Sequence, residues 1–380
     1  MSTFYVISKS YDPGSASTNH ALSFIRGFDA IGIKAKWVFI FPNEKCSKVD
    51  FEFKNISVEY LWSDRCCHHK YLRQIYKHYS YGMFFYRALK KGDTVLLLGS
   101  KVYLRKLSNR KDIRVFHELT EHPDVGKMSR LPIFTTKMYL KWVKKVDGLF
   151  VITNALKDYF VAQGVEGKLV HVINMVVDDE RFKGVEKTKV DYPYIAYCGN
   201  ASNTKDGVDD LIRAFAIVSK QIDNVRLRII GPKPVKGSVN DLLVKELDIV
   251  DRVDFVGCVS PSEMPQLLVN AQIVALARPD SLQNTYGFPT KMGEYLLSGN
   301  PVCVTAVGDI PLFLAHQQTA MLSACGDYEA FATNLIWCLE HIEEARQIGL
   351  RGREVARHNF NYLTESQKIL DVIFPKKKQQ

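Results

Sequence analysis

Apolar residues in the first half of the chain occur in short runs that alternate with longer segments of mixed polarity. The runs are rich in Val, Ile and aromatic residues and carry few charges, as expected of strands that are covered on both faces of a sheet. They lie at residues 4–8, 35–41, 94–98, 114–119, 148–153 and 168–173. Helix-length segments separate them, at residues 16–32, 69–91, 132–145 and 155–163. This alternation predicts a parallel sheet with helices on both faces.

A charged and turn-rich stretch at residues 174–192 interrupts the pattern, and we interpret it as a linker. A second alternating series follows it. Its strands are expected at residues 194–198, 226–230, 252–256, 273–277, 301–305 and 319–322, and its helices at 206–220, 240–247, 262–270, 289–298 and 328–341. The remainder of the chain is expected to be helical up to residue 374. The sequence therefore predicts two doubly wound, Rossmann-like α/β domains that face each other across an interdomain cleft, because such sheets bind ligands beyond the carboxyl ends of their strands.

The boundaries of this organisation follow from the break in the pattern. Residues 1–175 are expected to form the N-terminal domain and residues 192–360 the C-terminal domain. Residues 361–380 form a last helix and a basic tail, which we expect to return to the N-terminal domain.

The composition changes this picture little. The chain has 380 residues, of which 46% are hydrophobic and 24% charged, and this excludes collagen-like, disordered and disulfide-framework proteins. No apolar run reaches the roughly 20 residues that span a bilayer, and the first residues do not resemble a signal peptide. We therefore expect a cytoplasmic protein whose cysteines are reduced.

The net charge of +10 belongs to one half of the chain. Residues 1–190 contain 32 Lys and Arg against 19 Asp and Glu, whereas the remainder is slightly acidic. This asymmetry indicates an anionic partner for the N-terminal half. The segment 132–145 mixes lysines with aromatic residues, which is typical either of a helix on the inner face of an anionic membrane or of a packed helix with snorkelling lysines. No nucleic-acid-reading motif is present, so we do not expect a nucleic-acid partner.

The most informative segment follows the strand expected at residues 273–277. Gly287 allows a close approach of the backbone, and Pro289 suits the first position of a new helix. Free amides at such a helix start would bind an anion such as a diphosphate. Lys291 adds a cation there, and Glu294, about one turn on, would accept hydrogen bonds from ribose hydroxyls. The alternative interpretation is an ordinary helix start with a solvated Lys and Glu.

Two further groups of candidate residues lie in the N-terminal half. Gly14 and Ser15 follow the first strand and precede a helix, so they either approach a phosphate or only cap that helix. His117 and Glu118 lie at the carboxyl end of a strand, where cleft residues are expected, and Glu121 follows them. A structural histidine with solvated carboxylates is the alternative. Cys66-Cys67-His68-His69 invites a metal interpretation, but adjacent ligands cannot easily face one ion and no second pair has finger spacing, so no metal site is expected.

A family resemblance is carried by the segment Gly287-Phe-Pro-Thr-Lys-Met-Gly-Glu-Tyr-Leu-Leu-Ser-Gly-Asn-Pro-Val302 and by the following Val307-Gly-Asp-Ile-Pro311. This segment resembles the donor site of the GT-B glycosyltransferases, in particular the retaining glycosyltransferase family 4. Similar agreement holds at residues 151–154, 173–182, 197–215, 227–231 and 253–257. The resemblance covers residues 148–360 well and the N-terminal half loosely.

The resemblance implies a hexosyltransferase (EC class 2.4) that moves a sugar from a nucleotide-diphosphate sugar, UDP- rather than GDP-linked, to a glycan or lipid-linked acceptor in polysaccharide or envelope glycan biosynthesis. No metal or other cofactor is implied, since Lys205 and Lys291 would share the diphosphate. His117 and Glu118 would lie near the sugar, and Glu121 would hold acceptor hydroxyls. The donor residues implied are Gly14, Ser15, Gly199, Lys205, Gly231, Gln283, Asn284, Tyr286, Gly287, Phe288, Pro289, Thr290, Lys291 and Glu294.

Two departures from the family pattern keep alternatives open. Tyr286 occupies the place of the first of two motif glutamates, and Asn200 replaces an Arg that commonly accompanies the downstream Lys. The alternatives are another GT-B enzyme, either a nucleotide-sugar 2-epimerase or an inverting transferase, and a degenerate protein that only binds nucleotide sugars.

Overall fold

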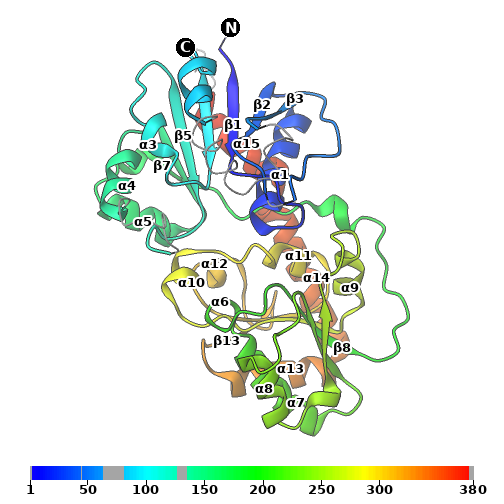
Figure 1. The fold of residues 1–380 in the computed structure, drawn as a ribbon. Coiled ribbons are helices and arrows are strands. Elements are labelled where there is room, and N and C mark those ends of the chain that lie inside the picture. Colours follow the sequence, from blue (N-terminus) through cyan, green and yellow to red (C-terminus); the bar gives the residue numbers. More distant parts are fainter. Residues whose placement is uncertain (1, 44, 63–80, 126–134, 376–380) are drawn as a thin grey trace. The chain divides into compact units, whose positions relative to one another are not determined.

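The computed structural model describes residues 2–43, 45–62, 81–125 and 135–375. The chain divides into two compact units (Figure 1). Unit 1 comprises Met1–Val176 together with Tyr362–Gln380, and unit 2 comprises Val177–Asn361. The motif at residues 66–69, most of the helix expected at 69–91 and the start of the basic segment at 132–134 lie outside the described residues.

A sheet of seven parallel strands forms the centre of unit 1. The strand order is β3-β2-β1-β4-β5-β6-β7, so that β1 and β4 are neighbours and the winding direction reverses between them. The strands are β1 (Phe4–Ser8), β2 (Ala35–Phe39), β3 (Ile56–Tyr60), β4 (Thr94–Leu98), β5 (Arg114–Leu119), β6 (Gly148–Val151) and β7 (Val170–Val172). The interior strands β1 and β4 are buried along their whole length, which explains why they appear in the sequence as uninterrupted apolar runs.

Helices connect these strands. They are α1 (Ala16–Ile31), the π-helical turn η2 (Phe84–Ala88), α3 (Leu104–Leu107), α4 (Thr136–Val143), α5 (Asn154–Ala162) and the 3-10 turn η3 (Gly167–Leu169). The N-caps of α1, α4 and α5 are Ser15, Thr135 and Thr153, each of which accepts a hydrogen bond from an amide three residues on. Such caps satisfy amide donors that the first helical turn leaves without partners.

The last helix, α15 (Tyr362–Ile373), belongs to unit 1 although it follows unit 2 in the sequence. It packs along α1, as Figure 1 shows with α15 in red. The close approach depends on Gly27 of α1, because a Cβ atom there would lie 2.1 Å from the Ser366 hydroxyl oxygen. Ile369 and Ile373 join the core cluster of the unit. The same core also contains Phe24 and Phe28 of α1, so α15 covers apolar surface that would otherwise face water.

Unit 2 repeats the architecture with six parallel strands in the order β10-β9-β8-β11-β12-β13. The strands are β8 (Tyr194–Cys198), β9 (Arg226–Ile230), β10 (Val253–Gly257), β11 (Ile273–Leu276), β12 (Val302–Thr305) and β13 (Met321–Ser323). The helices are η4 (Asp179–Phe182), α6 (Asn203–Asp206), α7 (Val208–Gln221), α8 (Val239–Glu246), η5 (Val250–Arg252), α9 (Met264–Asn270), α10 (Leu282–Tyr286), α11 (Met292–Leu297), α12 (Ile310–Phe313), α13 (Tyr328–Glu340) and α14 (Ile342–Asn359).

The expected fold class is confirmed, since both units are doubly wound parallel α/β structures. Cysteine chemistry differs in one respect: Cys46 forms a disulfide, whereas a uniformly reduced set of thiols was expected. The free cysteines among the described residues are Cys198, Cys258, Cys303, Cys325 and Cys338. Within the described part of the chain, every helix is too short or too polar to cross a membrane.

Candidate functional site

The loops that follow β8 and β11 meet at the carboxyl edge of the unit 2 sheet. The winding direction reverses between these two strands, and ligands of doubly wound sheets bind at such a position. The Arg278 side chain, which follows β11, donates to the carbonyl of Lys205 in α6 (3.3 Å). Gly207, at the end of α6, lies so near Ala277 that a Cβ atom would stand 1.8 Å from the Ala277 carbonyl oxygen. The two loops therefore form one continuous structure.

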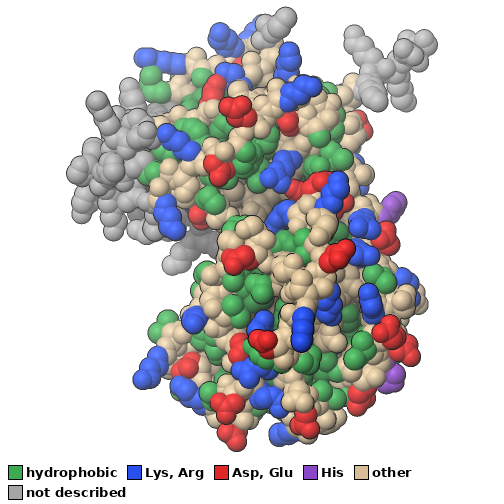
Figure 2. All heavy atoms as spheres, turned by 90° about the vertical axis from the view of Figure 1, so that its right-hand side faces the viewer, with side chains coloured by type: hydrophobic (Ala, Val, Ile, Leu, Met, Phe, Trp, Pro, Cys, Tyr) green, Lys and Arg blue, Asp and Glu red, His purple; other side chains and the backbone are tan. Residues whose placement is uncertain are grey.

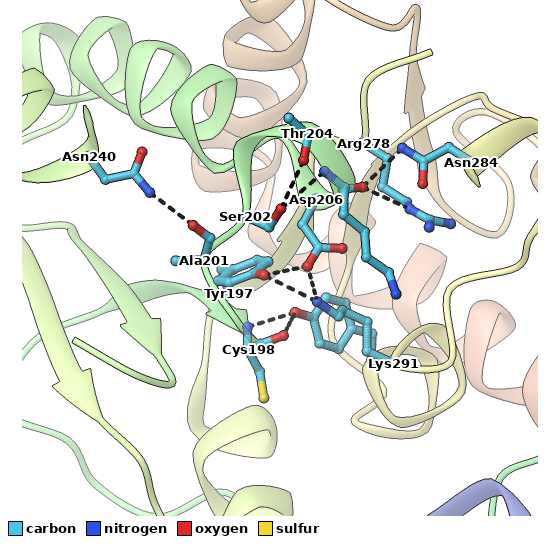
Figure 3. A network of polar contacts seen from close by, with 12 residues as sticks. Tyr197, Cys198, Ala201, Ser202, Thr204, Asp206, Asn240, Arg278, Asn284 and Lys291 are labelled. Carbon is cyan, nitrogen blue, oxygen red and sulfur yellow. Dashed lines mark hydrogen bonds and ion pairs between the residues drawn. The ribbon is translucent and has the colours of Figure 1, made fainter. Parts of the chain in front are cut away.

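Lys291 lies at the centre of this structure (Figure 3). Its ammonium donates to Asp206 Oδ2 at 2.8 Å and to the Tyr197 hydroxyl at 3.2 Å, and it also lies over the Tyr197 ring. Tyr197 donates in turn to the same carboxylate oxygen at 2.7 Å. The Lys291 side chain is 18% exposed and that of Asp206 5%. Burial lowers the pKa of Lys291, and the Asp206 carboxylate opposes that shift.

Glycines make room for the ammonium and for the close approach of the neighbouring loops. Gly199 follows β8 with φ 147°, and a Cβ atom there would stand 2.3 Å from Lys291 Nζ. Gly231 follows β9, and a Cβ atom there would stand 2.0 Å from the Gly199 carbonyl oxygen. Only residues without a side chain allow this approach. The structure therefore brings Gly199, Gly231 and Lys291, three of the residues expected at the donor site, into one group.

Two tyrosines, Tyr197 and Tyr295, make hydrogen bonds within this group. The Tyr295 hydroxyl accepts from the Cys198 amide at 2.7 Å and donates to the Cys198 carbonyl at 3.0 Å. Burial raises the pKa of the Cys198 thiol to about 12, so this thiol is neutral at physiological pH. Burial, and then the Asp206 carboxylate, raise the pKa of Tyr197 as well. Lys291 and Asp206 therefore carry the formal charges of this group.

The segment before Lys291 differs from the expectation in one important respect. The helix expected to begin at Pro289 begins at Met292, with Lys291 as its N-cap residue. A short helix that the sequence did not predict, α10, precedes it and is capped by Ser281. Pro289 and the two residues before it are buried in an irregular connection, and the Pro289 carbonyl accepts from the Met292 amide at 3.0 Å. The anion site expected at a helix start opened by Pro289 is therefore not present in that form, and the cation of Lys291 remains as its main feature.

Several expected donor residues of this segment have structural roles. Asn284 is fully buried, and its amide nitrogen donates to the carbonyls of Lys205 and Pro279. The Phe288 ring packs against Phe313 and Phe360 in an aromatic cluster. These two side chains shape the loop rather than face a ligand. Gln283, Tyr286 and Thr290 are half-buried and Lys205 is exposed.

Glu294 has a partner that sequence reasoning missed. The Arg181 guanidinium of η4 donates to its carboxylate and, at 2.7 Å, to the Pro261 carbonyl. Arg181 lies 113 residues from Glu294 in the sequence, so no local pattern could have linked them. Arg181 therefore orients the Glu294 carboxylate, which is expected to accept hydrogen bonds from ribose hydroxyls.

In unit 1, the residues expected near a phosphate cap a helix. Gly14 has φ 81°, a conformation that favours glycine. The Ser15 hydroxyl accepts from the Thr18 amide at 3.2 Å and thus caps α1. The alternative that capping alone explains these two residues is consistent with this geometry.

His117, expected to be catalytic, lies in the interior of unit 1. Its side chain is fully buried there. Nδ1 pairs with the Leu97 carbonyl at 3.0 Å and Nε2 with the Tyr139 hydroxyl at 2.9 Å. Burial lowers its pKa to about 4, so the ring is neutral at physiological pH. These contacts give His117 a structural role, and its catalytic role stays a prediction.

Glu118 also has an unexpected partner. Its carboxylate pairs with His20 Nε2 at 3.0 Å, and both side chains are about nine-tenths buried. His20 belongs to the second turn of α1, 98 residues earlier in the sequence. Glu121, expected to hold acceptor hydroxyls, lies two residues beyond β5. No cluster of three or more metal-ligating side chains occurs among the described residues, and the motif at residues 66–69 lies outside them.

Part of this chain is similar in sequence to a known protein family. Residues 192–341 match the family model "Glycosyl transferases group 1". Residues 192–341 are thus similar to the group 1 glycosyl transferases, and the whole chain has the GT-B fold. The matched residues contain β8, α6 and Lys291, so the group centred on Lys291 lies inside the matched segment. The resemblance inferred from the sequence is thereby confirmed.

Two curated relatives are similar in sequence. N-acetyl-alpha-D-glucosaminyl L-malate synthase of Bacillus anthracis is 31% identical over 163 residues, which are 43% of this chain and 39% of that protein. The amylovoran biosynthesis glycosyltransferase AmsK of Erwinia amylovora is 21% identical over 277 residues, 73% of this chain and 67% of that protein. The match therefore spans about two fifths of the first relative's length and two thirds of the second's.

Among solved structures, Anabaena HepE in complex with UDP and glucose is similar over nearly the whole chain. The TM-score is 0.71 with 16% sequence identity, and the superposition covers 98% of this chain and 99% of HepE. At this identity the likeness establishes the fold.

Proposed function

We propose that this protein transfers a sugar from a nucleotide-diphosphate sugar to a hydroxyl of a glycan or lipid-linked acceptor, with retention of the anomeric configuration. The family match and the presence of UDP and glucose in the HepE complex support a nucleotide-sugar donor. The name of AmsK supports a role in polysaccharide biosynthesis. UDP is the preferred nucleotide and no metal is required in this proposal.

One observation carries the proposal: the nearly buried ammonium of Lys291 lies against the backbone of Gly199 at the switch point of the unit 2 sheet. As the bond between sugar and phosphate breaks, negative charge grows on the diphosphate. A preorganised cation stabilises that charge more than it stabilises the bound substrate, and this difference accelerates the reaction. Lys205, exposed on α6 in the same structure, supplies the second positive charge.

Nucleotide binding tests the proposal directly. UDP, GDP and ADP are titrated into the wild-type protein by calorimetry, and thermal shifts are measured with the corresponding nucleotide sugars. We expect UDP to bind and the Lys291→Ala variant to lose at least about tenfold in affinity, which corresponds to about 1.4 kcal/mol. Lys245→Ala is the matched control, because Lys245 also pairs with a carboxylate at 2.8 Å but lies on the exposed helix α8. Failure of all three nucleotides to bind, or equal binding by both variants, would contradict the proposal.

The stereochemical part of the proposal requires a separate measurement. NMR of the anomeric proton of the first-formed product distinguishes a retaining from an inverting transferase. A nucleotide-sugar 2-epimerase would release a free epimer without any acceptor, and a degenerate binding protein would release nothing. Retention with a transferred sugar is the outcome we expect.

We further propose that unit 1 meets an anionic membrane at α4. The helix buries Tyr139 and Trp142, whereas Lys137 and Lys141 are exposed, and Lys144 and Lys145 follow them at the surface. Since the aromatic side chains point inward, the attraction would be electrostatic rather than insertive. On the face drawn in Figure 2, basic side chains are interspersed with acidic ones. Flotation with vesicles of neutral or anionic lipid tests this: binding that requires anionic lipid and fails at high salt is expected, and its absence would exclude the membrane role.

A further inference from the structure

The carboxylate of Asp206 is the counter-ion of Lys291, and sequence reasoning did not single it out. Asp206 ends α6, and Gly207 after it adopts the left-handed conformation against Ala277. This local structure fixes the Asp206 carboxylate beside the Lys291 ammonium. Oδ2 receives two hydrogen bonds, from the Tyr197 hydroxyl at 2.7 Å and from Lys291 at 2.8 Å. The arrangement is a compact, nearly buried triad of Tyr197, Asp206 and Lys291 (Figure 3).

An ammonium in such a position needs a negative partner to remain charged. Removal from water disfavours the charged form of a lysine, and an adjacent carboxylate restores it. The titratable and charged groups that act on Lys291 are Tyr197 and Cys198 of β8, Asp206 of α6 and Arg278 after β11, and Tyr295 of α11 contacts Cys198. Arg278 lowers the pKa of Lys291, whereas Asp206 raises it. The tyrosines and the thiol are neutral at physiological pH because burial raises their pKa values.

We propose that Asp206 is a positioning residue that keeps the Lys291 ammonium protonated and oriented toward the donor diphosphate before the donor arrives. The inference rests on the proposed function and adds to it the residue that prepares the phosphate-binding cation. The bound diphosphate then shares the ammonium with Asp206, so the lysine enters the complex already charged and needs no proton from solvent.

The consequence is a pH dependence that appears when the carboxylate is removed. In Asp206→Asn the side chain keeps its size and still accepts a hydrogen bond from Tyr197, but its charge is lost. Lys291 then becomes a buried amine without a counter-ion, and its pKa falls. Above that lowered pKa, a diphosphate binds only together with a proton, because the anion needs the charged lysine. Affinity should therefore decrease by up to tenfold per pH unit in the variant and remain nearly constant in the wild type.

The first measurement requires no ligand. Acetic anhydride reacts with neutral amines, and mass spectrometry of the intact, folded protein reports the rate at Lys291. At pH 8 we expect Asp206→Asn to be labelled at least about tenfold faster at this residue than the wild type, which corresponds to one unit of pKa. The matched control is Asp241→Asn, which breaks the exposed Asp241–Lys245 pair of equal length. In that variant the rate at Lys291 should equal the wild-type rate.

The second measurement is calorimetry with UDP between pH 6.5 and 8.5 in two buffers of different ionisation enthalpy. Proton uptake approaching one per UDP is expected for Asp206→Asn and none for the wild type. Tyr197→Phe keeps the carboxylate while removing its second hydrogen bond, so it should leave the pH profile flat. A variant that only damaged the fold would lose affinity equally at every pH.

The outcomes separate this inference from the proposed function. Equal labelling of Lys291 in Asp206→Asn and wild type would overturn the inference whatever the nucleotide result. Uniform loss of UDP affinity without proton uptake would also overturn it. If the wild type bound no nucleotide, the proposed function would fail on its own test, and the role given to Asp206 toward a diphosphate would fail with it.

Discussion

Gly199 makes room for the Lys291 ammonium, and replacing it should be costly. In Gly199→Ala the new Cβ atom would stand 2.3 Å from Lys291 Nζ and 2.9 Å from the Tyr197 hydroxyl oxygen. The ammonium must then leave its present position. We expect UDP affinity to fall at least about tenfold in calorimetry, with about 1–3 kcal/mol of lost stability from backbone strain at this φ.

The control for this prediction separates strain from collision. Gly237 also has a positive φ of 80°, but a Cβ atom there would meet nothing within 4 Å. Gly237→Ala should therefore lose stability and keep its affinity for UDP. Equal affinities for the two variants would show that the space beside Gly199 does not receive the nucleotide.

His117 provides a prediction about pH. Its pKa is about 4 in the folded protein, below the ordinary value of 6.5, so the unfolded chain binds more protons between these two pH values. The stability that depends on the neutral ring is present above pH 6.5 and is lost as the pH falls toward 4. From pH 7 to pH 5 the loss should be about 2 kcal/mol.

Urea unfolding at the two pH values measures this loss. His117→Gln removes the titrating ring, so its stability should fall by about 2 kcal/mol less than that of the wild type over the same interval. His358→Gln, at an exposed position of α14, should behave as the wild type does. An unchanged pH dependence in His117→Gln would contradict a buried neutral histidine.

At the residue scale, the sequence predicted the charged centre but not its partners. Lys291 was identifiable as a cation at the helix start expected after Pro289, and Gly199 through the family resemblance. Asp206, Arg181 and His20 were not, because they lie 85, 113 and 98 residues from Lys291, Glu294 and Glu118. Contacts at such separations depend on the fold. The same reason explains why the sequence did not reveal the contacts of His117 with Tyr139 and Leu97.

At the element scale, the contact between α1 and α15 can be tested. Gly27→Ala places a Cβ atom 2.1 Å from the Ser366 hydroxyl oxygen and must push the two helices apart. Overpacking of this kind costs about 1–3 kcal/mol, which exceeds the gain of about 1 kcal/mol from replacing a glycine inside a helix. We expect a lower free energy of unfolding in urea.

The double variant Gly27→Ala with Ser366→Gly is the decisive control. It removes the hydroxyl and the Cβ atom that the new methyl group would meet, so at least half of the lost stability should return once the cost of a glycine in α15 is subtracted. Additive losses in the two single variants would mean that the helices do not touch at this point.

The elements that the sequence failed to predict share a physical feature. Strand β3 is an edge strand with only its first residue buried, so it lacks the apolar run that revealed the interior strands. Helix α10 spans five residues, too few for a helical period to be visible. Pro289 suits a helix start in isolation, but the helix begins three residues later, after a stretch in which Phe288 packs in an aromatic cluster. Buried interior strands and long helices are predictable locally, whereas short elements depend on what packs against them.

At the scale of the whole molecule, nucleotide binding should protect one unit more than the other. Saturating UDP should slow hydrogen exchange at residues 199–207 and 277–294 relative to the protein without ligand. The reason is that the ligand stabilises the folded arrangement of these loops. The strands of the unit 1 sheet should exchange at nearly unchanged rates. Protection restricted to unit 1 would place the nucleotide away from Lys291.

The place of α15 in the core of unit 1 also bears on how the protein is made. While the nascent chain leaves the ribosome, the first 176 residues emerge without the helix that covers Phe24 and Phe28. All of unit 2 must be synthesised before that helix appears, a delay of roughly 10–40 s at typical translation rates. During this interval an apolar surface of unit 1 is open to chaperones or to other chains, so unit 1 is completed only by a helix that is synthesised after all of unit 2.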